Sequence, residues 1–366
     1  MLTGLLIQLI VSYQAGVEGY GIWSLFMNLV LVFTTLADWG VAVNGARLMQ
    51  LSTGKIWLAH AQFWRIRLSI FFALLFIITV FSFYQGASQI LIWGFPMILF
   101  SGFLLDWYER GRHRPEKAAT RQIAQSILQL LAIVVLFKLK SSLSWIIGSY
   151  ALIAVSTYFA MYTFSEKTEF KSSSAWSWLS SQLPIIAGFG AYHITYNLPL
   201  FLLGYVGTQQ ELGIYASHYI LYTSLATFGV ITMDIFLAKL DRKGYLFWLI
   251  LVTLAGVIMI LASGWYYPYL FAQKGYKWDQ TLALIMAGLC VFHVMRIYFF
   301  SEFLYAAQQQ KYGYWNALGL LLHICFFGFY MLSALSYDLI SAGFLLLSAE
   351  GFLVAILLIR KMISCV

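Results

Sequence analysis

The chain has 366 residues, of which 61% are apolar and only 10% are charged, and it carries a formal net charge of +8. In a soluble domain about a quarter of the residues are usually charged, so this composition excludes a soluble globular protein. The basic excess does not indicate nucleic-acid binding, because the Lys and Arg residues lie in loops between hydrophobic runs, where they orient helices. We therefore expect no nucleic-acid partner.

The three cysteines do not form a recognisable pattern. Cys290 and Cys325 lie inside apolar runs and Cys365 lies in the C-terminal tail. Neither a disulfide framework nor metal-ligand spacing is present. We expect no metal site and no cofactor.

About twelve mostly apolar runs fill the sequence, and roughly 20 such residues make a helix that crosses a bilayer core of about 30 Å. The sequence therefore predicts an all-α integral membrane protein with about 12 transmembrane helices. The first six spans are expected at Met1–Tyr13, Ile22–Val43, Ile66–Phe83, Ile90–Trp107, Ile123–Phe137 and Trp145–Phe164. The second six are expected at Leu183–Leu203, Ile214–Phe236, Tyr245–Tyr267, Leu282–Leu304, Tyr314–Leu332 and Ile340–Ile359.

Basic residues are distributed unevenly among the predicted loops. Loops after even-numbered spans, together with Arg67 at the start of the third span and the C-terminal tail, contain 17 of the 22 Lys and Arg residues. Loops after odd-numbered spans contain only Lys138, Lys140, Lys274 and Lys277. Because cytoplasmic loops carry the positive excess, we predict that both termini lie in the cytoplasm.

A short motif recurs in the two halves of the chain. Gly21-Ile22-Trp23 opens the second span and Gly213-Ile214-Tyr215 opens the eighth, 192 residues later. A match this short also arises by chance in a sequence rich in glycine and aromatic residues, but parallel repeats are a layout that transporters use. We predict two six-helix lobes around a central cavity. The lobes would cover residues 1–165 and 175–366, with a cytoplasmic linker over 166–174.

The first motif is part of a longer signature. The run Gly16-Val17-Glu18-Gly19-Tyr20-Gly21-Ile22-Trp23-Ser24, followed by Leu36-Ala37-Asp38-Trp39-Gly40-Val41 and then Arg47, resembles the N-terminal signature of polysaccharide-transport flippases. Its second-half counterpart runs from Asn197 to Gly207 and on to Glu211-Leu212-Gly213-Ile214-Tyr215. This family, which includes the O-antigen flippases, belongs to the multidrug/oligosaccharidyl-lipid/polysaccharide (MOP) exporter superfamily.

The resemblance implies a multi-pass protein of the bacterial cytoplasmic membrane that moves polyprenyl-pyrophosphate oligosaccharide outward by alternating access. The glycan would serve O-antigen, capsule or exopolysaccharide synthesis. The implied partners are the lipid-linked oligosaccharide, membrane lipids and the polysaccharide polymerase machinery.

Two other functions remain open. A drug or cation antiporter of the MATE type would share the fold. A membrane glycosyltransferase or polymerase usually has a sizeable outer loop, whereas the outer loops here contain few acids, and no Walker, His-Glu-x-x-His or Gly-x-Ser-x-Gly motif occurs. We therefore expect a protein that is not an enzyme. The outer acids are Glu18, Glu211, Asp279 and Asp338.

Arg296 is the basic residue placed well inside an apolar span. A charged side chain costs roughly 2.5–3.5 kcal/mol at a helix centre, and no acid shares its helix face, although His293 does. A guanidinium matches phosphate bidentately, so we predict that Arg296 and His293 bind the pyrophosphate. The alternative is that an unpaired Arg296 extends to the headgroups.

The seventh span contains two prolines and several glycines, and we expect it to be broken by the prolines, to bend and to line the cavity. His193, Tyr196 and Asn197 share one of its faces and are candidate ligands for sugar hydroxyls. The alternative role is hydrogen bonding between helices. Asp38 and Arg47, near the cytoplasmic end of the second span, are candidate gating residues, although Asp38 could equally pair locally.

Overall fold

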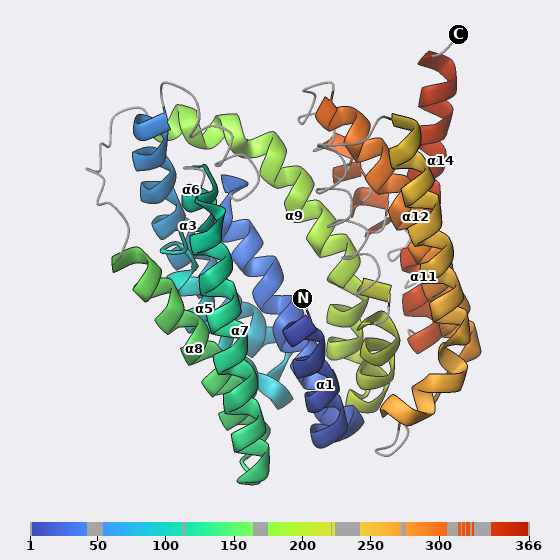
Figure 1. Cartoon of the computed structure of the whole chain (residues 1–366), viewed down its shortest axis with the longest axis horizontal. Coiled ribbons are helices and arrows are strands. Elements are labelled where there is room, and N and C mark those ends of the chain that lie inside the picture. The colour runs from blue at the N-terminus through green and yellow to red at the C-terminus, as the bar shows by residue number, and fades with distance from the viewer. Residues whose placement is uncertain are drawn as a thin grey trace. The chain divides into compact units, whose positions relative to one another are not determined.

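The part of the chain that the computed structural model describes is almost entirely helical (Figure 1). It describes residues 2–41, 54–111, 114–163, 175–220, 222–223, 242–271, 276–305 and 338–364, with short pieces between 314 and 325. Within these ranges no strand occurs, as the all-α prediction requires. Five of the described helical stretches are long and apolar enough to cross a membrane: Thr3–Asp38, Ala61–Phe83, Glu116–Lys138, Leu143–Ala160 and Ile340–Ile359.

The chain divides into two compact units, one of Met1–Gln14 with Leu25–His193 and one of Ala15–Ser24 with Ile194–Val366. The segment from Ala15 to Ser24 therefore belongs with the second half of the sequence. The predicted linker, 166–174, lies outside the described residues, and the predicted lobe boundaries stay predictions.

The first two predicted spans form one element, α1 (Leu2–Asp38), which is interrupted at Gly16. Gly16 has a φ of 73° and a ψ of −178°, a conformation that is accessible to glycine and strained for other residues. The Tyr276 hydroxyl donates to the Gly16 carbonyl at 3.1 Å. Burial raises the pKa of Tyr276, so the hydroxyl keeps its proton and remains a donor.

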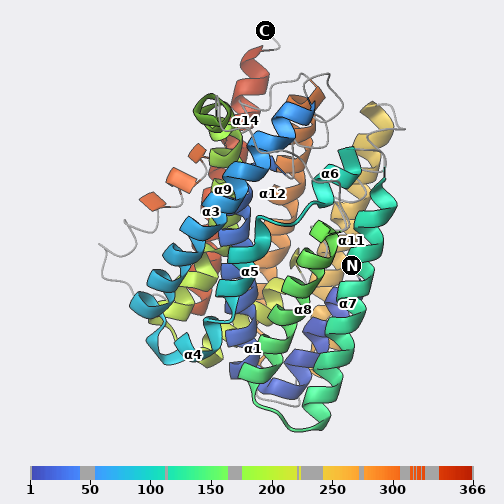
Figure 2. The ribbon, with the colours of Figure 1, turned by 90° about the vertical axis from the view of Figure 1, so that its left-hand side faces the viewer.

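Four helices make up most of the first unit: α3 (Gly54–Phe83), α5 (Gly94–Ser101), α7 (Pro115–Lys138) and α8 (Leu143–Thr163). α5 packs against α3 and α8, and α7 lies beside α8 (Figure 2). α7 and α8 expose large apolar side chains, which suits a lipid-facing surface. They include Leu128, Leu131, Val135 and Leu152.

The prediction of one helix over Ile90–Trp107 is wrong. After η1 (Gln85–Ala87), this region forms α4 (Ser88–Leu91), α5 and α6 (Asp106–Gly111). α5 ends before Gly102, where a Cβ would lie 3.0 Å from the Ile66 Cα atom and 3.1 Å from the Arg65 carbonyl oxygen. Because α3 approaches this closely, only glycine fits at position 102, and the interrupted helix leaves backbone carbonyls that need other donors.

The boundary between the units falls within α9 (Ala175–Val206), after His193. The second unit continues with helical residues 209–220, α11 (Arg242–Phe271), α12 (Gln280–Tyr305) and α14 (Leu339–Ser364). α12 packs against both α11 and α14. α9 runs as one helix through Pro184 and Pro199, so the seventh span is not broken at its prolines. Its predicted bend stays a prediction.

Three of the four acids in the predicted outer loops take part in helix N-terminal caps. The Glu211 carboxylate accepts from the Thr208 backbone N–H at 2.8 Å, and the Glu211 N–H donates back to the Thr208 hydroxyl at 3.2 Å, which makes a capping box. Asp279 accepts from the Leu282 N–H at 2.9 Å. Asp338 accepts from the Ser341 N–H at 2.8 Å. These three acids therefore stabilise the N-terminal ends of helices.

Candidate functional site

A buried ion pair joins α12 to α14. Nη1 of Arg296 donates to Oε1 of Glu350, and the two side chains are 3% and 1% exposed. The guanidinium carbon also lies 5.4 Å from the centre of the Tyr196 ring, which adds a cation–π contact. The interpretation of Arg296 as unpaired is therefore wrong, because its partner comes from another helix. The alternative of extension to the headgroups is also wrong, because the side chain is buried.

One carboxylate oxygen of Glu350 remains available as a hydrogen-bond acceptor. Its Oε2 atom is buried and has no hydrogen-bond partner in the part of the chain that the structure describes. A buried carboxylate oxygen in this state leaves a strong hydrogen-bonding capacity unused. The pair is neutral overall, yet it can accept a donor such as a hydroxyl group.

Tyr196 and Asn197 lie beside this pair inside the second unit, 4% and 3% exposed. The Tyr196 ring stacks on Tyr222 with centroids 6.2 Å apart, and the Tyr219 hydroxyl donates to the Tyr196 carbonyl at 2.9 Å. Helix-to-helix bonding is thus one role of this segment. Substrate binding by Tyr196 and Asn197 stays a prediction.

The two predicted histidines have different outcomes. His193 is half-buried at the end of the first unit, and its ring makes an edge contact with Tyr192 at 5.1 Å. His293 belongs to α12, but its side chain lies outside what the structure describes. Its role beside Arg296 therefore stays a prediction.

Asp38 pairs with Arg65 of α3 at 2.9 Å. Arg47, its predicted gating partner, lies outside the described residues. The Arg65 guanidinium is 3% exposed and also donates to the carbonyls of Leu104 at 2.6 Å and Ser101 at 3.3 Å. Arg65, which the sequence placed in a loop, is therefore a buried residue of α3 that satisfies the carbonyls released where α5 ends.

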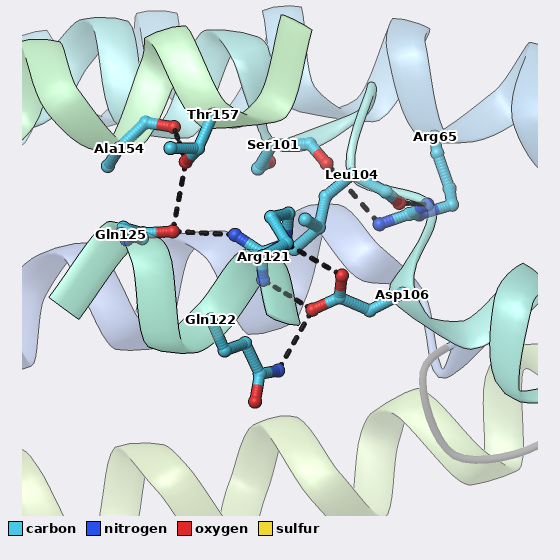
Figure 3. Close-up of polar contacts among 9 residues, drawn as sticks. All are labelled: Arg65, Ser101, Leu104, Asp106, Arg121, Gln122, Gln125, Ala154 and Thr157. Carbon is cyan, nitrogen blue, oxygen red and sulfur yellow. Dashed lines mark hydrogen bonds and ion pairs between the residues drawn. The ribbon is translucent and has the colours of Figure 1, made fainter. Parts of the chain in front are cut away.

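A second network fixes α6 on α7 (Figure 3). Nε of Arg121 donates to Oδ1 of Asp106 at 2.8 Å, and Nη2 donates to Oδ2. Nη1 donates to Oε1 of Gln125 at 2.5 Å, and that oxygen also accepts from the Thr157 hydroxyl at 3.0 Å. Gln122 donates to Asp106 at 2.9 Å. All three guanidinium nitrogens of Arg121 are thus used within the first unit.

A polar pocket of about 350 Å³ lies beside this network, between the start of α1 and α7. Apart from Arg121, whose guanidinium is bonded to Asp106 and Gln125, its polar groups are uncharged amides and hydroxyls, which is unusual for a membrane span. These groups both donate and accept hydrogen bonds. They belong to Thr3, Gln122, Gln125, Ser126 and Tyr158.

The two copies of the repeated motif contact each other through their glycines. A Cβ on Gly21 would lie 2.8 Å from the Gln209 carbonyl oxygen and 2.9 Å from the Gly213 nitrogen. A Cβ on Gly213 would collide with the Val17 carbonyl oxygen. Each glycine therefore faces the carbonyl four residues before the other glycine, so the contact is reciprocal. Backbones approach this closely only where side chains are absent.

Sequence reasoning missed Glu350, Asp106 and the buried state of Arg65. Glu350 carried a usable signal, because it is an acid inside the predicted span Ile340–Ile359. A charged side chain is costly there, as it is at Arg296. Asp106 lies at the end of a predicted span that is in fact three helices, so its position gave no comparable signal.

Comparison with protein-family models and with curated proteins finds no match. Comparison with solved structures finds transporters. A multidrug resistance MATE family transporter of the MOP superfamily, in an inward-facing conformation, has a TM-score of 0.69 at 14% identity, covering 100% of this chain and 94% of the other.

The lipid II flippase MurJ, in an inward closed conformation, has a TM-score of 0.68 at 12% identity, covering 99% of this chain and 87% of the other. A MOP superfamily transporter from Pyrococcus furiosus has a TM-score of 0.56 at 14% identity, covering 99% and 92%. Because these likenesses extend over the whole chain, the protein has the all-α, multi-pass membrane fold of MOP superfamily transporters.

Proposed function

We propose that the protein is a flippase that moves lipid-linked oligosaccharide across the cytoplasmic membrane by alternating access. The observation that carries this proposal is the polar pocket beside α7, whose amides and hydroxyls suit sugar hydroxyls. A glycan head is uncharged and rich in hydroxyls, so it is recognised by hydrogen bonds. The resemblance of the Gly16–Ser24 run to polysaccharide-transport flippases supports the same substrate class.

Three of the buried acids agree with this substrate. Asp38, Asp106 and Glu350 each pair with an arginine of their own unit. A cationic drug that bound one of these acids would have to displace an arginine, which leaves a buried charge without its partner. In our proposal, the pyrophosphate competes with Glu350 for the Arg296 fork, and Glu350 Oε2 accepts a donor from the substrate.

The other residues that the sequence singled out keep separate proposed roles. His293 would assist Arg296, while His193, Tyr196 and Asn197 would contact the sugar. Asp38 would act in gating at the predicted cytoplasmic end, with Arg47 as an exchange partner for Arg65. The lipid-linked oligosaccharide is the proposed partner, together with membrane lipids and the polymerase machinery.

A drug or cation antiporter is the second candidate, because the likeness to a multidrug MATE transporter is as close as that to MurJ, with TM-scores of 0.69 and 0.68. One experiment separates the two. The chain is expressed in a bacterium that lacks its own flippase for a known surface glycan, and lipid-linked repeat units on the cytoplasmic leaflet are measured. Restored surface glycan supports the flippase. Unchanged glycan with raised drug resistance supports the antiporter.

A further inference from the structure

A separate pocket of about 420 Å³ opens between α6, α7 and α8. Its inner wall has a buried acid, Glu109 of α6, and its rim has two exposed charged residues of α7, Glu116 and Lys117. Small side chains leave room between α7 and α8. These side chains belong to Thr120, Ala124, Thr157 and Ala160.

Glu109 is 4% exposed, and its Oε2 atom has no hydrogen-bond partner among the residues that the structure describes. A buried carboxylate normally requires a donor or a cation. Arg121 also lines the pocket, but its three guanidinium nitrogens donate to Asp106 and Gln125. The protein therefore presents an acid to this pocket and uses the nearby arginine elsewhere.

The pocket lies beside the start of α7, where the candidate membrane span Glu116–Lys138 begins. Lipid headgroups are therefore expected at this level. The excess of basic residues in the adjoining loop places this end on the predicted cytoplasmic side.

An apolar track leads away from the pocket along α7. Ala124 is followed on the same helix face by Leu128, Leu131 and Val135, which are 51%, 57% and 52% exposed. Residues at this spacing lie one above the other on a helix. The track provides a surface for an acyl chain below a site for a headgroup.

We propose that this pocket binds a phospholipid with an ethanolamine headgroup from the inner leaflet. Its ammonium group donates to Glu109, its phosphate lies at Lys117, and one acyl chain follows the exposed face of α7. Phosphatidylglycerol has no ammonium group, and the quaternary nitrogen of phosphatidylcholine has no N–H to donate. The proposal does not depend on which substrate the chain transports.

The test is native mass spectrometry of the purified full-length protein, released from micelles that contain phosphatidylethanolamine, phosphatidylglycerol or phosphatidylcholine. Wild type should retain phosphatidylethanolamine in preference to both other lipids. Glu109→Gln keeps the shape of the side chain and removes its charge, and should lower this preference about tenfold, the loss expected for one charge-assisted hydrogen bond.

Two further variants make the result specific. Glu18→Gln removes the same charge from an exposed residue at the predicted outer end and should leave the preference unchanged. Lys117→Gln should reduce the retention of phosphatidylethanolamine and of phosphatidylglycerol equally, because both lipids carry a phosphate. The proposal is overturned if wild type retains the three lipids equally, or if Glu109→Gln keeps the wild-type preference.

Discussion

Arg296 and Glu350 are 54 residues apart in the sequence and share a buried hydrogen bond between α12 and α14. Each makes the other tolerable inside an apolar helix, since a lone charge there is costly. This relationship changes what a mutation of Arg296 reports. Loss of transport after Arg296→Ala would reflect either a missing phosphate ligand or an uncompensated Glu350.

A double-mutant comparison separates these two effects. Glu350→Gln or Arg296→Gln alone should lower stability by about 3–5 kcal/mol, because each leaves a buried charge without its partner. The double variant should recover most of this loss, as measured by thermal unfolding in detergent. If Arg296 binds pyrophosphate, the double variant should fold but not transport, whereas restored transport would contradict that role. Arg296→Lys should reduce transport, because it loses the bidentate fork.

The reciprocal glycine contact predicts a position-specific effect of one methyl group. Gly213→Ala places a Cβ against the Val17 carbonyl and should cost about 1–3 kcal/mol, as overpacking does. Gly4→Ala is the matched control, since a Cβ there meets nothing within 4 Å, and a helix gains up to about 1 kcal/mol from this change. Equal unfolding temperatures for the two variants would contradict the close approach.

Two arginines of α3, two residues apart, should behave differently. Arg65→Ala removes the ion pair with Asp38 and two donors to carbonyls near the end of α5, so it should cost about 3–5 kcal/mol. Arg67 is exposed and lies over the Phe63 ring at 3.4 Å, so Arg67→Ala should cost about 1 kcal/mol or less. Protein yield after membrane extraction and thermal unfolding measure the difference. Similar losses for both would show that the Arg65 contacts are unimportant.

The predicted orientation is tested by labelling single cysteines in a background without Cys290, Cys325 and Cys365. A membrane-impermeant maleimide added to intact cells should label Glu18→Cys and not Lys117→Cys, because the positive-inside rule places residue 117 in the cytoplasm. Permeabilised cells should allow both reactions. The reverse pattern in intact cells would invert the topology.

The sequence predicted the helical fold well, because the length and hydropathy of each span are local properties. It failed where a second helix decides the outcome. The interruption at Gly102 depends on the close approach of α3, and Gln62 of α3 donates to the Gly102 carbonyl at 2.8 Å. Nothing in the run Ile90–Trp107 indicates a donor 40 residues earlier.

The same limit applies to the candidate site. The sequence identified Arg296 and Asp38 as charges in unusual places, and it could not assign their partners, because Glu350 and Arg65 come from other helices. The sequence-based prediction also overestimated the effect of the two prolines on the continuity of α9. A proline removes one backbone donor from a helix and bends it, yet the helix continues from Ala175 to Val206.

The glycine contact is self-complementary. Val17 and Gln209 each precede a glycine by four residues, so either segment presents the same two features, a carbonyl and a bare Cα, to its counterpart. A surface of this kind needs only one sequence to pair with itself about a two-fold axis. The contact therefore requires glycine at both 21 and 213, whereas the carbonyls that face them are backbone groups, which any residue at 17 and 209 supplies.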